Sequence, residues 1–572
     1  MREKIYDNSN IAESYAGATT PLTFSFARYV YQEVYQHFSK MMGAGNRLVQ
    51  ANKNTFEHMI EFIGYRIYYN LNSWYTMLSF FPAYKLSSEF MEKMMGVEKH
   101  NALKIAKDYS FYRKYFLYLP KTILQIIKIS LTFSFLGRSM KRFNKYFERI
   151  FSELNAIDLD ELNLGELRSL YEKADAKLLA RWRIPIANDF AVMVSAGLAD
   201  KLFKKWLTSD NAYSYMATTA SGSLASIDPG RRMMQIAKHI QQDEKVKEVF
   251  LGKYSEEEIL ELLSTKFAPN QVAIEVKTYL RDFGTRMPNE LKLESETLME
   301  NPKNFIAIIK GLVRKEYFPP EDLPNTQLRE VAFRDAGLYK KIFLKWLLRW
   351  AGNSIRRREE ARFHRTLIFG FIRRVFLVIG KKMKQNNIIN KDRDIFYLTK
   401  EEIFDIIDNK GLRTNPVTII EQRKREFTKW QNTELPRRIE TDKSISEIEQ
   451  EMSHRSPINQ QSYLNELAGR VASCPNNMQV FSGKALTLKN FDPSADFKGK
   501  ILVTCQTDPG WTIIFPLLKG VVVERGGMLS HAAIVARELN IPCIVGVEHA
   551  TEIITSGMNI KLDLQNGLIH KI

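Results

Sequence analysis

The chain has 572 residues and a mass of 66.5 kDa, which at roughly 100–200 residues per domain predicts several compact units. Its composition, 45% hydrophobic and 26% charged residues, excludes collagen-like, disordered and disulfide-scaffold proteins. The net charge is +18, of which residues 482–572 carry +1 and the preceding 481 residues carry +17. A basic excess of this kind suits nucleic acid, anionic lipid or phosphorylated ligands.

The three cysteines, Cys474, Cys505 and Cys543, form no Cys-x-x-Cys pair. They predict neither a disulfide framework nor a metal site, and they fit a reducing cytoplasm. The N-terminus lacks the apolar core of a signal peptide. The apolar run from Ile123 to Leu136 contains Lys128 and is shorter than the roughly 20 residues of a membrane span. We predict a buried helix there, with a helix at a membrane interface as the alternative.

Residues 24 to about 410 are predicted to be mainly helical, because their apolar residues recur with a period of 3.6. The clearest predicted helices are Tyr29–Met42, Lys141–Leu154, Ile236–Phe250, Glu257–Leu263 and Tyr339–Trp350. Aromatic residues, 12% of the chain, cluster between Phe24 and Tyr75. Core packing is the default explanation for them, and a cavity for a flat or apolar small molecule is a second hypothesis.

Between about residues 411 and 481 the periodicity weakens, which predicts a linker with one or two helices. After residue 481, short β-branched runs alternate with turn residues and predict strands at Ile501–Cys505, Gly520–Glu524, Cys543–Gly546 and Asn559–Leu562, with a helix at His531–Leu539. The predicted fold class is therefore multidomain α and α/β. A large, mainly helical domain (1–410) and a linker (411–481) precede a small α/β domain (482–572).

One stretch of the C-terminal domain has the features of an anion site. A valine-rich run leads into Gly526-Gly527, and Ser530 then precedes His531 at the start of an alanine-rich segment. Ser530 is a good helix N-cap, and the first turn of a helix offers unpaired N–H groups and partial positive charge. From position alone, His531 is either a phosphoryl-handling group or a structural residue of the first turn.

The segment Gly526–Val547, with Thr507-Asp508-Pro509-Gly510-Trp511 upstream, resembles the swivelling phosphohistidine domain of the phosphoenolpyruvate-utilising enzymes. The resemblance covers residues 482–572 and is strongest to the phosphoenolpyruvate synthase-like enzymes and rifampin phosphotransferase. It implies that His531 is the phosphorylated residue, with Gly527, Ser530 and Arg537 as phosphate-binding candidates. Thr507, Asp508, Gly510 and Trp511 would form the loop beside the histidine, with Trp511 as a packing element; Arg537 is alternatively a surface or packing residue.

The helical region resembles the drug-binding part of rifampin phosphotransferase more weakly. The patches of similarity are Glu13–Ser25, Phe283–Leu291, Arg357–Arg362 and Asp394–Glu402. Thr285 stands where relatives have a histidine, so the role of that histidine does not transfer to this chain. Arg358, Arg362 and Arg365 fall on one face of a helix, where they could receive the phosphohistidine or a phosphorylated product; a solvated basic face is the alternative. Lys341, Lys345 and Arg349 are predicted to be the wet side of an amphipathic helix.

Related enzymes load the histidine from an ATP-grasp nucleotide domain, and this chain has no Gly-x-x-x-x-Gly-Lys-Ser/Thr loop. The resemblance therefore implies that ATP and Mg bind to a partner ATP-grasp protein, which the +17 region would help to dock. No cofactor, metal or membrane span is predicted for this chain, and the expected location is the cytoplasm.

Three functions remain open at this stage. The first is the carrier and acceptor component of a split dikinase-type phosphotransferase, acting on a small molecule. The second is a condensing, ligase-like enzyme that activates its substrate by phosphorylation, as in the similar prodigiosin-forming enzymes. The third is a non-catalytic protein with a relic domain that binds a ligand or nucleic acid; nucleic acid is disfavoured because no recognition motif is present.

Overall fold

The computed structural model describes residues 3–82, 119–206, 228–314, 337–412, 414–433, 435–453, 466–475, 479–489, 491–492, 495–528 and 530–572. The chain divides into two compact units that interleave in sequence. The first unit is Met1–Val194, Leu291–Glu294 and His364–Asn459, and the second is Ser195–Glu290, Ser295–Phe363 and Gln460–Ile572.

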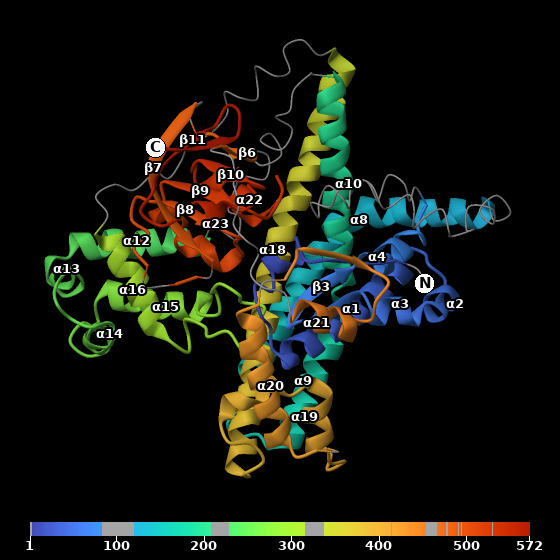
Figure 1. Cartoon of the computed structure of the whole chain (residues 1–572), viewed down its shortest axis with the longest axis horizontal. Helices are drawn as coiled ribbons and strands as arrows, with labels where there is room; N and C mark the ends of the chain where they lie inside the picture. Colours follow the sequence, from blue (N-terminus) through green and yellow to red (C-terminus); the bar gives the residue numbers. More distant parts are fainter. Residues whose placement is uncertain are drawn as a thin grey trace. The chain divides into compact units, whose positions relative to one another are not determined.

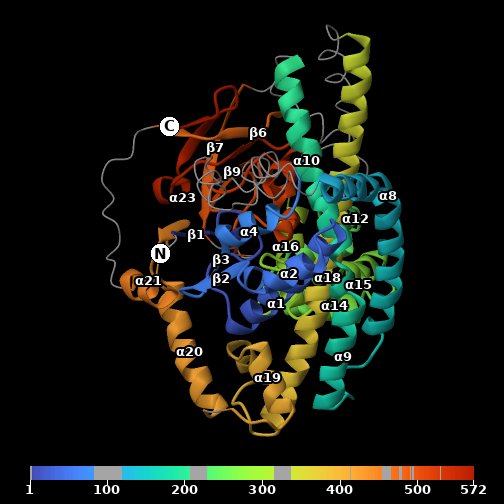
Figure 2. The same ribbon diagram turned by 90° about the vertical axis from the view of Figure 1, so that its right-hand side faces the viewer.

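The first unit combines helices with a small antiparallel sheet, whose strands β2, β3 and β1 lie beside one another in Figure 2. The sheet order is β2-β3-β1-β4, from β1 (Lys4–Asp7), β2 (Ile60–Ile63), β3 (Arg66–Asn70) and β4 (Arg438–Thr441). The helices are α1 (Pro21–Met41), α2 (Asn46–Ala51), α3 (Lys53–Glu57), α4 (Leu71–Leu78), α8 (Leu119–Asn155), α9 (Leu164–Lys177), α19 (Lys400–Ile407), α20 (Pro416–Gln431) and α21 (Ile445–Met452), with short 3-10 turns η1 (Ile11–Glu13), η3 (Leu179–Arg181) and η4 (Asp392–Tyr397).

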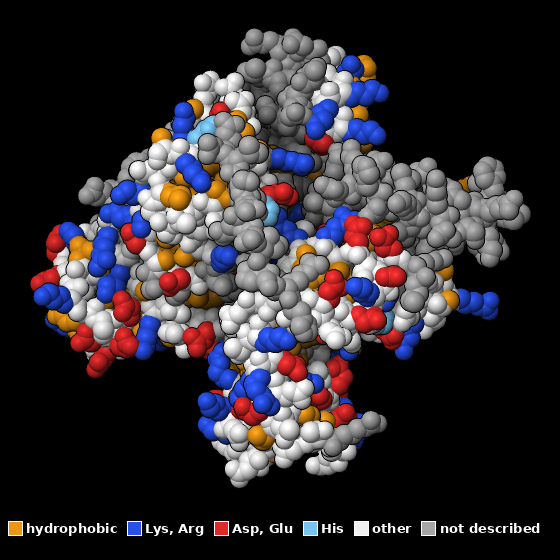
Figure 3. Space-filling view, in the orientation of Figure 1, with side chains coloured by type: hydrophobic (Ala, Val, Ile, Leu, Met, Phe, Trp, Pro, Cys, Tyr) orange, Lys and Arg blue, Asp and Glu red, His pale blue; other side chains and the backbone are white. Residues whose placement is uncertain are grey.

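Two helices run through both units: α10 (Arg183–Trp206) and the long α18 (Leu338–Gln385), both labelled in Figure 1. Figure 3 shows Lys and Arg side chains gathered at the end where α18 begins. Lys345 and Arg349 are exposed there as predicted. Tyr339 and Trp346 are 69% and 54% exposed as well, so this end of α18 is not a purely polar surface.

Side-chain caps explain where many helices of the first unit begin. Thr399 caps α19 in a capping box with Glu402, a pattern that satisfies two otherwise unpaired N–H groups. At α1, Pro21 occupies the first turn, where its missing N–H costs nothing. Glu294 accepts hydrogen bonds from the Thr20 N–H at 3.1 Å and from the Thr23 hydroxyl at 2.6 Å. The opening Thr-Pro-Leu-Thr motif is thus fixed from a distant part of the chain.

The second unit joins a helical subdomain to an eight-stranded sheet in the order β5-β12-β11-β7-β8-β9-β10-β6. Strands β7 to β10 are mutually parallel in that order. Its helices are α12 (Asp228–Gln242), α13 (Glu244–Leu251), α14 (Glu256–Ser264), α15 (Gln271–Phe283), α16 (Pro302–Val313), α22 (His531–Glu538) and α23 (Ala550–Ile553), with 3-10 turns η6 (Pro509–Ile513) and η7 (Phe515–Leu517). The strands are β5 (Glu466–Ala468), β6 (Arg470–Ser473), β7 (Val480–Leu488), β8 (Ile501–Thr504), β9 (Gly520–Val523), β10 (Cys543–Val545), β11 (Asn559–Asp563) and β12 (Leu568–Lys571).

One continuous apolar core crosses from the helical subdomain into the sheet. It includes Ile309 and Leu312 of α16, Phe515 of η7, and Val535 of α22. Gly230 at the start of α12 lies so near η6 that an added Cβ would come within 3.2 Å of the Thr512 carbonyl. Burial of apolar surface therefore holds the strand-rich domain against α12 and α16 in this structure.

Several predicted elements are confirmed and others are corrected. The strands at 501, 520, 543 and 559 and the helix at 531 are present. The predicted helix Ile236–Phe250 is two helices, because the Asp243 side chain accepts hydrogen bonds from the N–H groups of Lys245 and Val246 and so starts α13.

The helix predicted at 123–136 is present, but the prediction that it is buried is wrong. The segment is helical within α8, yet Ile123, Leu124 and Leu131 are 49%, 65% and 53% exposed. Apolar composition does not by itself determine which side chains find a packing partner.

The predicted linker, residues 411–481, contains regular structure at both ends. Strand β4 pairs with β1 in the first unit. Strands β5 and β6 pair with β12 and β10 in the eight-stranded sheet. Strand pairing between residues far apart in sequence produces these assignments, so local patterning did not reveal them. The three-part domain division stays a prediction.

Candidate functional site

His531 is the first residue of helix α22, immediately after the loop that follows strand β9. Gly526 in that loop has φ +115°, a conformation that favours glycine, and Gly527 is half-buried beside it. The Ser530 hydroxyl accepts a hydrogen bond from the Ala533 N–H at 3.4 Å. The structure has the order predicted from the sequence: a strand, a glycine turn, an N-cap and a helix. This order places the imidazole at the helix N-terminus.

The His531 ring is buried, with 1% of the residue exposed. Its Nε2 atom lies 2.8 Å from the Thr512 hydroxyl, and its Nδ1 atom has no hydrogen-bond partner among the described residues. The pKa of His531 is lowered to about 3, chiefly by burial; the charge of Glu359 acts to raise it, and the charges of Arg362, Arg286 and Arg358 act to lower it. The ring is therefore neutral at physiological pH, the form in which an imidazole nitrogen has a lone pair for nucleophilic attack.

Arginine side chains of α18 surround a buried carboxylate close to this ring. Glu359 is fully buried and lies 3.2 Å from Arg362 Nη1 and 3.5 Å from Arg358 Nε. Burial acts to raise the pKa of Glu359, but the charges of these arginines lower it overall, with smaller effects from His531 and Arg286. Arg358 and Arg362, two of the predicted phosphate-binding residues, thus lie within electrostatic range of His531.

A third arginine approaches from the loop after α15. Arg286 is 1% exposed, and its Nη1 atom donates to the two carboxylate oxygens of Glu290 at 3.1 and 3.3 Å. The ring of Phe363 lies 5.0 Å from its guanidinium carbon, a cation–π arrangement. Together Arg286, Arg358 and Arg362 form what we call the guanidinium cluster, and all three charges act on His531.

The predicted loop beside the histidine, residues 507–511, interlocks with residues 286–290. Asp508 accepts hydrogen bonds from the Asn289 N–H at 2.5 Å and from the Gly510 N–H at 2.8 Å. Burial and the neighbouring Glu290 raise the pKa of Asp508 to about 8. Gly510 packs directly on the Met287 backbone. This loop, which we call the strand-end loop, therefore holds the histidine-bearing domain against the segment that carries Arg286.

The two remaining residues of the predicted loop, Trp511 and Thr507, are both buried. Trp511 is 4% exposed and packs edge-on against Phe491 with ring centroids 5.2 Å apart, in agreement with a packing element. Thr507 is also buried, and its hydroxyl has no hydrogen-bond partner among the described residues.

Two further residues predicted to bind phosphate, Arg537 and Arg365, interact with groups other than His531. Arg537 Nη1 donates to the Met528 carbonyl at 2.7 Å, which anchors the loop preceding His531. Arg365 follows Arg362 by three residues in the same helix and lies just inside the first unit. Its charge acts there on buried tyrosines, including Tyr15 and Tyr31.

Sequence reasoning missed four residues of the site: Thr512, Arg286, Glu290 and Glu359. Thr512 follows the strand-end loop directly, and Arg286 and Glu290 lie inside a segment singled out only for Thr285. Glu359 stands between the predicted arginines. A buried ion pair four residues apart, as in Arg286 and Glu290, has the same sequence spacing as an exposed one, so only burial separates the two.

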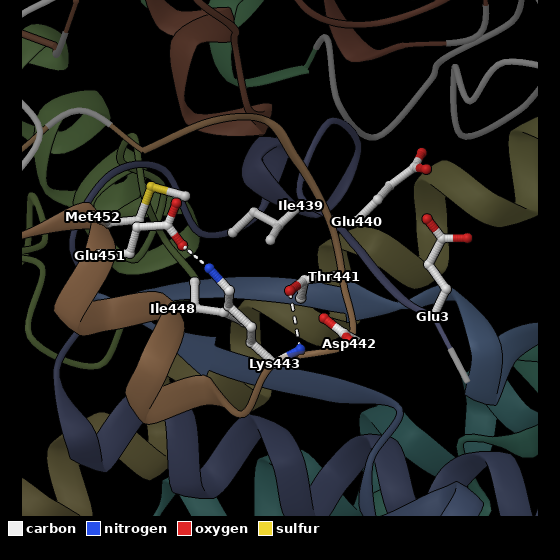
Figure 4. Close-up of a pocket in the computed structure, with 9 residues that line it drawn as sticks. All are labelled: Glu3, Ile439, Glu440, Thr441, Asp442, Lys443, Ile448, Glu451 and Met452. Atoms are coloured by element: carbon white, nitrogen blue, oxygen red, sulfur yellow. Dashed lines mark hydrogen bonds and ion pairs between the residues drawn. The ribbon is translucent and has the colours of Figure 1, made fainter. Parts of the chain in front are cut away.

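The pocket of Figure 4 is unrelated to these residues. It has a volume of about 490 Å³ and is lined in the first unit by Glu3, Ile439, Glu440, Thr441, Asp442, Lys443, Ile448, Glu451 and Met452. Lys443 pairs with Glu451 across it at 2.7 Å. None of the predicted site residues lines this pocket.

Neither a metal site nor a membrane-spanning helix is present among the described residues. They contain no group of three or more His, Cys, Asp or Glu side chains placed to hold a metal ion. None of their helices is both long and apolar enough to cross a membrane.

A neutral, buried histidine at a helix N-terminus, with the charges of several guanidinium groups acting on it, is an arrangement that could handle a phosphoryl group. Comparison with known families agrees with this class. Residues 496–567 match the mobile domain of the PEP-utilising enzymes, and residues 186–359 match the fourth domain of rifampicin phosphotransferase. Over these two segments the chain is therefore similar to the phosphoenolpyruvate-utilising enzymes.

Individual proteins are similar to this chain over part of their length. Rifampicin phosphotransferase of Bacillus cereus is 26% identical over 401 residues, which cover 67% of this chain and 44% of that protein. The prodigiosin synthesizing transferase PigC of Serratia marcescens is 23% identical over 432 residues, covering 72% and 46%. A probable phosphoenolpyruvate synthase of Staphylothermus marinus is 39% identical over 113 residues, covering 19% and 13%. The chain thus spans less than half the length of these relatives.

Proposed function

We propose that this chain is the histidine-carrier and acceptor component of an ATP-dependent phosphotransferase. The observation that carries the proposal is the placement of His531, a neutral imidazole facing the guanidinium cluster, within residues that match a mobile domain. A partner protein of the ATP-grasp type supplies the phosphoryl group from ATP and Mg. A small molecule, aromatic or apolar in character and bound by the helical region, accepts it.

The reaction divides into two transfers. In the first, a ring nitrogen of His531 attacks a phosphorus atom of ATP, and an N–P bond forms as the P–O bond to the leaving nucleotide breaks. In the second, a hydroxyl oxygen of the acceptor attacks that phosphorus, the N–P bond breaks, and the hydroxyl loses its proton. Arg358 and Arg362 neutralise the phosphoryl oxygens. In this proposal the ionised Glu359, whose pKa is lowered, takes the proton.

Loading and discharge require two positions of the histidine-bearing domain. Only 1% of His531 is exposed in this structure, so a nucleotide reaches the ring only after the domain has left Arg286 and α18. We place the hinge for this movement in residues 411–481. Movements of this kind gate many enzymes on the microsecond to millisecond scale.

Transfer of label from ATP tests the proposal. With the partner protein present, radiolabel from ATP is expected on this chain as an acid-labile, base-stable adduct, and His531→Ala is expected to abolish it. Labelling that survives the substitution would show that His531 is not the carrier.

A condensing reaction is the second candidate, because PigC, a prodigiosin synthesizing transferase, aligns with 72% of this chain. In that reaction the phosphorylated substrate is joined to a second molecule and the phosphoryl group is lost. Mass spectrometry of the product separates the two outcomes: a gain of one phosphoryl group supports transfer, and loss of water between two substrates supports condensation.

A further inference from the structure

Arg286 combines deep burial with unused hydrogen-bonding capacity. One end of its guanidinium is held by Glu290 through Nη1, and Phe363 lies against it. Its Nε and Nη2 atoms are buried and have no hydrogen-bond acceptor among the described residues. Buried polar groups are nearly always paired, and each exception calls for an explanation.

The two unused donors belong to the same edge of the guanidinium group. Nε–H and one N–H of Nη2 point in parallel along that edge, which is the fork that binds two oxygens of a carboxylate or phosphate at once. Glu290 occupies a different nitrogen, so the fork and the ion pair do not compete. The Glu290 contact and the Phe363 ring restrict the guanidinium to one orientation, which lowers the entropic cost of binding an anion.

The surroundings of this fork indicate which anion it receives. The charge of Arg286 acts on both His531 and Glu359. His531 also has an unpaired ring nitrogen, Nδ1, in the described structure. The strand-end loop fixes the register between the two elements, because Asp508 accepts the Asn289 N–H three residues beyond Arg286. We therefore expect a phosphoryl group on His531 to lie beside this fork while Asp508 accepts the hydrogen bond from the Asn289 N–H.

We propose that Arg286 is a phosphoryl-binding residue whose Nε and Nη2 atoms receive two oxygens of a phosphoryl group at His531. This inference rests on the proposed function for the origin of the phosphoryl group. It adds a subsite outside α18, so the group is held from two sides: by α18 and by the loop after α15. Glu290, Phe363 and Asp508 act as positioning residues for this subsite.

Binding of inorganic phosphate to the unmodified full-length chain tests the subsite without any phosphorylation of His531. Isothermal titration is expected to show at least tenfold weaker phosphate binding for Arg286→Met. Arg286→Lys keeps a positive charge beside Glu290 but lacks the fork, and it is expected to show a similar loss. Arg281→Met removes a charge that is 73% exposed at the end of α15 and is the matched control, with affinity unchanged.

Arg286→Met leaves Glu290 buried beside Asp508 and endangers folding, so Arg286→Lys with an unchanged melting midpoint is the deciding variant. Wild-type affinity in a folded Arg286→Lys chain would overturn the inference. A second measurement separates it from the proposed function: the chain is treated with phosphoramidate and the phosphohistidine is followed by ³¹P NMR. Arg286-dependent phosphate binding without transfer of label from ATP to His531 would uphold the subsite and reject the carrier role.

Discussion

Replacement of Gly510 by alanine tests whether the strand-end loop holds the histidine-bearing domain in place. A Cβ atom at this position would lie 2.0 Å from the Met287 carbonyl carbon and 2.2 Å from the Pro288 nitrogen. Both are backbone atoms and cannot rotate away. Gly510 itself has no positive φ, so alanine brings no strain to the loop and the clash arises only where the loop meets residues 287–288.

The size of the effect follows from these distances. Ordinary contact begins near 3.4 Å, so the loop must retreat by about 1.4 Å, which breaks the 2.5 Å hydrogen bond between the Asn289 N–H and Asp508. Overpacking costs about 1–3 kcal/mol, and an unmade buried hydrogen bond costs about 1–3 kcal/mol. A total of about 2–6 kcal/mol lowers the docked population relative to the undocked one roughly 30- to 20,000-fold.

Modification of His531 by diethyl pyrocarbonate reports this change, because the ring is 1% exposed when the domain is docked. The Gly510→Ala chain is expected to react at His531 at least tenfold faster than wild type, as measured by peptide mass spectrometry. Gly45→Ala is the matched control, since nothing lies within 4 Å of a Cβ there. Equal protection of His531 in wild type and Gly510→Ala would refute the idea that this contact seats the domain.

Three further predictions concern the histidine and the thiols. Thr512→Val removes the hydrogen-bond partner of His531 Nε2 and is expected to slow transfer of label from ATP to His531 about tenfold. Thr512→Ser keeps the hydroxyl and is expected to be labelled at nearly the wild-type rate. Equal labelling rates for the two variants would contradict a role for the hydroxyl. Since the pKa of His531 falls from 6.5 to about 3 on folding, its contribution to stability is present above pH 6.5 and is lost as the pH falls from 6.5 to 3. The melting midpoint of His531→Gln should therefore drop less between pH 7.5 and 4.5 than that of wild type. Part of the remaining drop comes from His364, whose pKa is lowered to about 4 by burial. An equal drop in both chains would refute the lowered pKa of His531. A thiol reagent is expected to label the exposed Cys474 in the native chain. It is expected to label Cys543 only after unfolding, because that residue is fully buried and its pKa is raised to about 12. Labelling of Cys543 in the native chain would show that the sheet opens.

Local chemistry made the C-terminal domain predictable. The alternation of β-branched runs with turn residues located strands β8 to β11, since these features act within a few residues of one another. The Gly-Gly turn, the Ser530 cap and His531 are likewise encoded within six residues. The central residue of the candidate site and its place at a helix N-terminus therefore follow from the sequence alone.

Contacts between distant segments decided the rest. Only the folded chain brings Thr512, Arg286 and Glu359 within reach of His531. Likewise, β4, β5 and β6 are strands because partners remote in sequence pair with them. A residue's neighbours along the chain determine its cap, turn or periodicity, whereas its burial, pKa and ion-pair partners depend on segments that only tertiary packing brings together.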